Sequence, residues 1–159
     1  MQPDVNQLVD VPVEPCPEGA SVEKWRLEGK VQILDELLTL LENGSRIGNR
    51  TKLKTDFINR AKKATTGIGD GIGIPHIRSL QAKDFMLAFA RSSTGYDFGA
   101  PDDQAVRMFF VMAAPPYEDN LYLKVFKSLA EKLRYESFRE ELMLAQSPGE
   151  IIRIIRAAE

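Results

Sequence analysis

The stretch TGIGDGIGIPH, residues 66–76, separates two differently patterned parts of the chain. Its alternating glycines exclude an α-helix, because glycine in a helix interior costs about 1 kcal/mol relative to alanine. The same glycines leave backbone N–H groups open to an approaching anion, and Pro75 fixes the backbone just before His76. His76 is the only histidine in the chain, and histidine is the side chain that titrates near neutral pH. This stretch is therefore the first candidate for chemistry.

The residues before this stretch predict two helices behind an irregular beginning. Residues 1–20 contain four prolines and Gly19, so we expect an irregular N-terminal extension there and one domain over 21–159. In residues 30–43, leucines recur at i, i+3, i+4 and i+7, and Gly44 follows as a left-handed stop. A second amphipathic helix is expected over 51–64.

The residues after the stretch predict strands and then helices. The apolar runs 84–90 and 106–113 have the length and composition of buried strands, with turn residues over 92–99 around a possible short strand. Apolar stripes over 122–133 and 138–145 predict two helices, and Ser147-Pro-Gly-Glu150 is a capping box that starts a third. Helices, buried strands and further helices indicate an α/β fold, with a mixed central sheet sandwiched between helical layers in a single domain.

Composition excludes several classes of function. The net charge is −2 and no basic run with interleaved aromatics occurs, so we expect no nucleic-acid partner. Cys16 is the only cysteine, which rules out an intrachain disulfide and, with one histidine, a Cys/His metal cluster. The N-terminus has no basic and apolar leader, and the run 108–114 falls short of the roughly 20 residues that span a bilayer. We expect a soluble cytoplasmic protein without direct membrane contact.

A histidine nucleophile fits the chemistry of residues 66–76. A neutral imidazole offers one nitrogen lone pair to phosphorus while its other N–H is held by an acceptor. Nucleotide motifs do not fit, because G-x-G-x-x-G would require glycine at Ile72 and no G-K-[ST] follows. On the residues alone, an ordinary structural histidine in a glycine-rich turn stays the alternative.

The same stretch resembles the phosphorylation-site signature of the fructose/mannitol-type enzyme IIA domains of the bacterial phosphotransferase system, a family that includes nitrogen-regulatory enzyme IIA. Further likenesses follow in family order. Residues 95–103 and 106–112 resemble the turn and core strand after the site, 123–130 the helix beside the histidine, and 145–152 the start of the terminal helix. The resemblance covers residues from about 20 to 159.

The resemblance implies a phosphotransferase that works through a phosphohistidine. His76 would accept a phosphoryl group from an HPr-type phosphocarrier protein and pass it to an enzyme IIB domain or a regulatory target, in sugar transport or nitrogen regulation. No small-molecule cofactor is implied. Two alternatives stay open: a regulatory binding module whose partner affinity depends on phosphorylation of His76, and a degenerate relative that is not phosphorylated.

The resemblance also implies roles for residues around the histidine. Arg60 lies sixteen positions before it, where the family has an arginine that pairs with phosphoryl oxygens. Asp70 is a weaker candidate for orienting the ring, and Gly69, Gly71 and Arg78 are expected to meet the phosphate. On the residues alone, Arg60 reads as a solvated helix arginine and Arg78 as an exposed charge at a strand edge.

The sequence departs from the family pattern at three positions. Tyr122 stands where the family often has a second histidine; a tyrosine can donate a hydrogen bond to phosphate but carries no charge at neutral pH, and burial in the core explains it equally well. Ile77 replaces a small residue and is expected to crowd an approaching partner. Gly73 replaces alanine and is expected to loosen the backbone.

Overall fold

The centre of the molecule is a pair of long antiparallel strands, β5 (Met86–Tyr96) and β6 (Val106–Ala114). The computed structural model describes residues 4–5, 14–42 and 47–157. In these residues the sheet has six strands: five follow the order β1-β5-β6-β3-β2, and the sixth, β4, also pairs with β6. Parallel and antiparallel pairs both occur, so the sheet is mixed. The four short strands are β1 (Asp4–Val5), β2 (Gly67–Gly69), β3 (Ile72–Gly73) and β4 (His76–Arg78).

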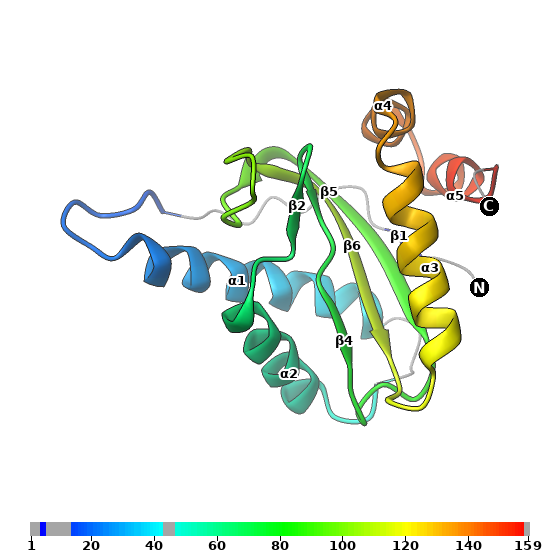
Figure 1. The fold of residues 1–159 in the computed structure, drawn as a ribbon, viewed down its shortest axis with the longest axis horizontal. Coiled ribbons are helices and arrows are strands. Elements are labelled where there is room, and N and C mark those ends of the chain that lie inside the picture. Colours follow the sequence, from blue (N-terminus) through cyan, green and yellow to red (C-terminus); the bar gives the residue numbers. More distant parts are fainter. Residues whose placement is uncertain (1–3, 6–13, 43–46, 158–159) are drawn as a thin grey trace.

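The two central strands are buried on both faces because a helical layer covers each face (Figure 1). On one face, Ala88 and Val111 pack with the leucines of α1 (Val22–Glu42) and with α2 (Arg50–Lys63). On the other face, Phe89 and Phe110 pack with the three C-terminal helices. Those helices are α3 (Asp119–Lys132), α4 (Glu136–Leu144) and α5 (Pro148–Ala157). The predicted α/β/α architecture is confirmed.

Two predicted boundaries were wrong. The first helix begins at Val22, eight residues before the expected start, and its expected stop, Gly44, lies outside the described residues. Strand β5 continues to Tyr96, although residues 92–99 were expected to form a turn around a short strand. The pairing with β6 shifts register between Arg91 and Tyr96, and Gly95 there has a φ of +80°. A bulge of this kind absorbs the turn-forming residues without ending the strand.

Side chains cap the starts of two helices, and the capping box predicted at the second is shifted in detail. At α2, the Asn49 side chain accepts a hydrogen bond of 3.0 Å from the N–H of Lys52, which caps the helix. At α5, the Ser147 hydroxyl accepts from the N–H of Glu150 at 3.2 Å. The Glu150 carboxylate accepts from the N–H of Gln146 at 2.7 Å instead of that of Ser147, so the return half of the capping box lies one residue earlier.

Two contacts join the described part of residues 1–20 to the rest of the chain, although residues 14–20 are mostly exposed and extend beyond the start of α1 (Figure 1). Asp4–Val5 form β1 alongside β5, and the indole N–H of Trp25 in α1 donates to the carbonyl of Glu14 at 2.7 Å. The division at residue 20 stays a prediction. None of the helices that the structure describes combines the length and apolarity needed to cross a bilayer.

Candidate functional site

The first half of the glycine-rich stretch is a tight β-hairpin. β2 and β3 are joined by Asp70 and Gly71, whose φ angles are +57° and +76°. Two consecutive positive φ values are typical of the type I′ turn, which matches the natural twist of antiparallel strands. The turn is held by the N–H of Asp70, which donates to the Asp102 carboxylate at 2.8 Å.

The second half of the stretch carries His76 along the sheet edge. Ile74 donates its N–H to the carbonyl of Thr66 at 2.8 Å, and the carbonyl of Pro75 accepts from the N–H of Met112 at 2.9 Å. Pro75 has no N–H to donate, so the strand breaks there and resumes as β4. Among the described strands, β4 pairs only with β6. His76 thus lies half-buried at the edge of the sheet, with α2 contacting β4 and Tyr122 of α3 beside the ring.

The imidazole of His76 is held in one tautomer. Its Nδ1 lies 2.6 Å from the carbonyl oxygen of Ile74. A carbonyl only accepts, so Nδ1 carries the proton and the neutral ring has its lone pair on Nε2. Burial lowers the pKa of His76, the Ile74 carbonyl opposes that shift, and the charge of Arg60 lowers the pKa further. The ring is therefore neutral at pH 7, as a nucleophile requires.

Aromatic side chains from α3 enclose the ring. Phe126 lies edge-on to His76 with 5.0 Å between ring centroids, and Tyr122 lies 6.1 Å away. Tyr122 is only 6% exposed, and the guanidinium carbon of Arg78 lies 4.8 Å from the centre of its ring. Burial raises the pKa of Tyr122 against the opposing charges of Arg78 and Arg60. Tyr122 therefore keeps its hydroxyl proton at neutral pH.

Arg60 places a positive charge near His76 from α2, which covers the face of the sheet opposite α3. It lies in the last turn of α2, where a positive charge is favoured by the helix dipole, and its Nη1 donates to the carbonyl of Ala64 at 3.2 Å. With Arg78 it lines an open depression of about 660 Å³. With Pro75 and His76 it also borders a small enclosed gap on the face that α1 and α2 cover.

Comparison with known proteins identifies the family. Residues 22–158 match the family described as "Phosphoenolpyruvate-dependent sugar phosphotransferase system, EIIA 2". The chain belongs to this EIIA family.

The matched region makes up a different share of each relative's length. The fructose-specific EIIA component of Haloferax volcanii is 34% identical over 120 residues, which are 76% of each chain. The fructose-specific EIIABC component of Bacillus subtilis is 33% identical over 126 residues, which are 79% of this chain and 20% of that protein. The crystal structure of nitrogen regulatory protein IIA-Ntr from Neisseria meningitidis matches with a TM-score of 0.73 and 32% identity, over 79% of this chain and 86% of that one. The chain thus spans about a fifth of the Bacillus relative.

In this EIIA chain, four of the expected site residues lie together: His76, Arg60, Arg78 and Tyr122. Gly69, Asp70 and Gly71 do not join them. β3 pairs with β6 at Met108 whereas His76 pairs with it at Met112. Four residues along a strand span roughly 13 Å, so the hairpin turn is remote from the ring. Asp70 lies 3.8 Å from Arg139 instead of orienting His76.

The remaining departures from the family pattern take structural positions. Ile77 packs against the core beneath α1 and α2, and the alternation of strand side chains turns it to the face opposite His76. It also lines the depression beside α2. A β-carbon at Gly73 would lie 3.0 Å from Cγ1 of Val106, so glycine there accommodates a close approach of β6. The structure thus gives a packing reason for glycine at this position, and the expectation that Gly73 loosens the backbone stays a prediction.

Sequence reasoning gave Phe126 only a place on the apolar stripe of its helix, although it contacts the candidate nucleophile. Its spacing of four residues from Tyr122 was the available signal, since such residues share a helix face. Lys52 and Lys63 were also missed. They line the depression with Arg60, from which they stand eight and three residues away on one face of α2.

Proposed function

We propose that the domain is a phosphohistidine carrier of the phosphoenolpyruvate-dependent phosphotransferase system. It accepts a phosphoryl group from an HPr-type phosphocarrier on Nε2 of His76 and passes it to an enzyme IIB domain or a regulatory protein. The observation that carries this proposal is the hydrogen bond from Nδ1 to the Ile74 carbonyl, because it leaves Nε2 as the lone-pair atom of the ring.

The transfer needs no proton to leave the ring. The Nε2 lone pair forms a bond to phosphorus while the donor's bond to phosphorus breaks, and that electron pair returns to the donor. The imidazole of His76 becomes cationic as the bond forms, and its Nδ1–H stays on the Ile74 carbonyl. A charged donor makes a stronger hydrogen bond than a neutral one, so this contact favours the phosphorylated state.

Arg60 and Arg78 supply the positive charge that the phosphoryl oxygens need. A guanidinium presents a planar fork of donors that matches two oxygens at once. Arg78 also stacks on Tyr122, which occupies the position of the family's second histidine. In this proposal Tyr122 and Arg78 together replace the imidazolium of a second histidine. The tyrosine hydroxyl donates a hydrogen bond to the phosphoryl group, and the arginine supplies the positive charge. Gly69, Asp70 and Gly71 are left out of the phosphate site because they lie at the hairpin turn.

The proposal also covers the acceptor protein, the bounds of the domain and its place in the cell. Fructose-specific relatives and a nitrogen regulatory protein match at nearly equal identity, 34% and 32%, so both kinds of acceptor are included. Family membership does not favour the degenerate, unphosphorylated alternative. We place the phosphocarrier domain at residues 21–159, with residues 1–20 as an extension, and the protein in the cytoplasm.

The test is phosphorylation of the purified protein with phosphoenolpyruvate, enzyme I and an HPr-type donor, followed by intact mass and acid-lability measurements. We expect one acid-labile phosphoryl group in the wild type and none in His76→Ala. Phosphorus NMR should place the group on Nε2. A phosphoryl group that persists in His76→Ala, or that is attached to Nδ1, contradicts the proposal.

A further inference from the structure

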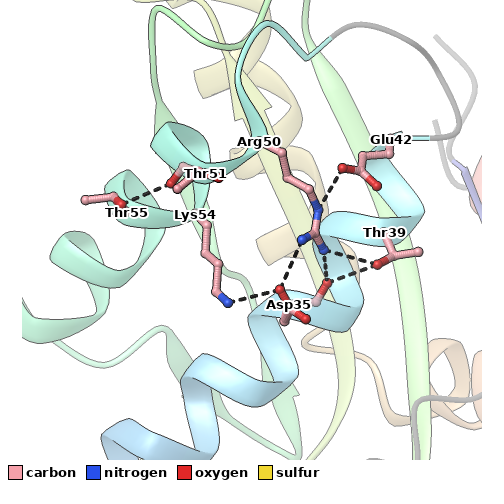
Figure 2. Close-up of polar contacts among 7 residues, drawn as sticks. All are labelled: Asp35, Thr39, Glu42, Arg50, Thr51, Lys54 and Thr55. Atoms are coloured by element: carbon pink, nitrogen blue, oxygen red, sulfur yellow. Dashed lines mark hydrogen bonds and ion pairs between the residues drawn. The ribbon is translucent and has the colours of Figure 1, made fainter.

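Helix α2 is joined to its neighbours by polar contacts on two sides. On one side, cations in its first half bind carboxylates of α1 (Figure 2). Arg50 donates to the Asp35 carboxylate at 3.2 Å and lies 2.7 Å from the Glu42 carboxylate. Lys54 donates to the same Asp35 oxygen at 3.0 Å. These contacts hold the two helices together and do not involve the strand that carries His76.

The second contact of α2 reaches the end of that strand. Ser79 directly follows β4, is only 4% exposed, and donates its N–H to the carbonyl of Ala114 in β6 at 2.9 Å. Its hydroxyl donates to the Asp56 carboxylate of α2 at 2.5 Å. The hydroxyl oxygen also accepts a hydrogen bond of 3.1 Å from the N–H of Gln81, so its single proton is committed to Asp56. The Asp56 carboxylate is thereby fixed to the strand end.

The carboxylate that Ser79 binds lies one helical turn before Arg60. The two residues are four apart, so their side chains share a face of α2, and both line the depression beside β4. A carboxylate four residues before a cation on a helix favours an ion pair with it. Within the described residues no such pair forms, because Arg60 donates to the carbonyl of Ala64 while Asp56 accepts from Ser79. The partner of Asp56 therefore decides whether the charge of Arg60 is compensated.

The charge of Arg60 acts on both rings of the site. Burial lowers the pKa of His76, and Arg60 lowers it further against the opposing Ile74 carbonyl. Burial raises the pKa of Tyr122, and the charges of Arg78 and Arg60 oppose that rise. A carboxylate paired with Arg60 would cancel much of this charge. It would also occupy the guanidinium donors that phosphoryl oxygens need.

We propose that Ser79 is a positioning residue for phosphoryl transfer, because its hydroxyl holds the Asp56 carboxylate away from Arg60. The guanidinium then keeps its planar fork of donors free for the phosphoryl group on His76. This inference rests on the proposed phosphocarrier function and adds two residues that do not themselves react. Ser79 and Asp56 act only through Arg60 and make no contact with the transferred group.

The first experiment compares two substitutions of Asp56 that have the same shape and differ in charge, Asp56→Glu and Asp56→Gln. It measures labelling of His76 by phosphoramidate, whose phosphorus–nitrogen bond breaks with release of ammonia as the bond to Nε2 forms. The additional methylene carries the end group past Ser79 into reach of Arg60, where a carboxylate pairs and an amide does not. We expect labelling of Asp56→Glu to be about threefold to tenfold slower than that of the wild type, and labelling of Asp56→Gln to be at least as fast. Equal rates in the two variants overturn the inference.

The second experiment is a double-mutant cycle that tests whether Ser79 acts through Arg60. Ser79→Ala leaves the Asp56 carboxylate without its partner, so labelling should slow about threefold to tenfold. The double variant Ser79→Ala/Asp56→Asn should regain most of the rate, because the competing charge is gone. In Arg60→Ala, the further change Ser79→Ala should leave the rate as it is. A loss of the same factor with and without Arg60 contradicts the inference.

The control for general loosening of α2 is Asp35→Asn, which weakens the joint with α1 (Figure 2). Chemical denaturation should show a lower stability, while phosphoramidate labels His76 at the wild-type rate. If Asp35→Asn slows labelling as much as Ser79→Ala does, the inference is overturned. If the wild type accepts a phosphoryl group neither from phosphoramidate nor from an HPr-type donor, the proposed function fails. A labelled wild type with all Asp56 and Ser79 variants at its rate overturns this inference alone.

Discussion

The two halves of the glycine-histidine stretch do different things in the structure. Residues 67–73 form a hairpin whose turn has two consecutive positive φ angles, and they pair with the sheet away from the imidazole. Residues 76–78 form an edge strand that holds His76 between α2 and α3. The comparison shows that the glycines are needed for the backbone path and for close packing. In the proposed function, contact with the phosphoryl group falls to side chains from other elements.

The largest effect on chemistry is expected at Arg60. Arg60→Ala should lower the rate of phosphoryl acceptance about tenfold to a hundredfold, because it removes charge-assisted hydrogen bonds worth about 1.5–3 kcal/mol. The free energy of unfolding should change little, since the only hydrogen bond that the side chain makes in the described residues is to Ala64. Labelling kinetics and chemical denaturation measure the two quantities. Arg60→Lys should restore part of the rate, and an unchanged rate in Arg60→Ala would reject the role.

A substitution in the hairpin, residues 67–73, should lower the stability and leave the phosphorylation rate unchanged, which is the reverse of the effect expected at Arg60. Gly71 has a φ of +76°, while a β-carbon there has room, with its nearest neighbour 3.6 Å away. Gly71→Ala should therefore cost about 1–2 kcal/mol of stability through backbone strain alone and leave the phosphorylation rate unchanged. The matched control is Gly149→Ala in α5, where space is open and alanine is the better helix former, so stability should stay or rise. A slower phosphorylation rate in Gly71→Ala would tie the hairpin to the chemistry.

The contribution of His76 to the stability of the fold should depend on pH. Burial holds the pKa of His76 below its ordinary value of 6.5. Below about pH 6.5 the unfolded chain therefore binds a proton that the folded chain does not, so stability falls as the pH is lowered from there towards the folded pKa. Above about pH 6.5 this group adds no pH dependence. Denaturation of the wild type and His76→Ala at several pH values should show the loss only in the wild type. Equal pH dependence in both proteins would contradict the buried, neutral histidine.

The smallest expected effect is at Tyr122. Tyr122→His should raise the transfer rate about threefold, because an imidazolium donates a charged hydrogen bond where the hydroxyl donates a neutral one. Tyr122→Phe, which keeps the ring under Arg78 and removes the hydroxyl, should lower it. Rapid-quench transfer measurements distinguish the two. If Tyr122→His is no faster than the wild type, the stack of Arg78 on Tyr122 already replaces the second histidine.

Much of the fold was predictable because its signals are local. The leucine spacing of α1, the Ser147 cap of α5 and the apolar runs of β5 and β6 each follow from the nearest residues in the chain. The extent of β5 was not predictable in the same way. Its turn-forming residues are accommodated by a bulge against β6, and that bulge depends on a partner strand.

For the candidate site, the sequence predicted which residues to consider but not how they are arranged in space. The sequence by itself determined that His76 follows a proline, that a helix precedes the glycines and ends near Arg60, and that apolar strands need cover on both faces. Only the tertiary structure decided that Arg60, Arg78 and Tyr122 lie around His76 while Gly69 and Gly71 do not. The physical reason is strand register: β6 pairs with both halves of the stretch, and pairing at Met108 and Met112 sets the distance between the turn and the imidazole.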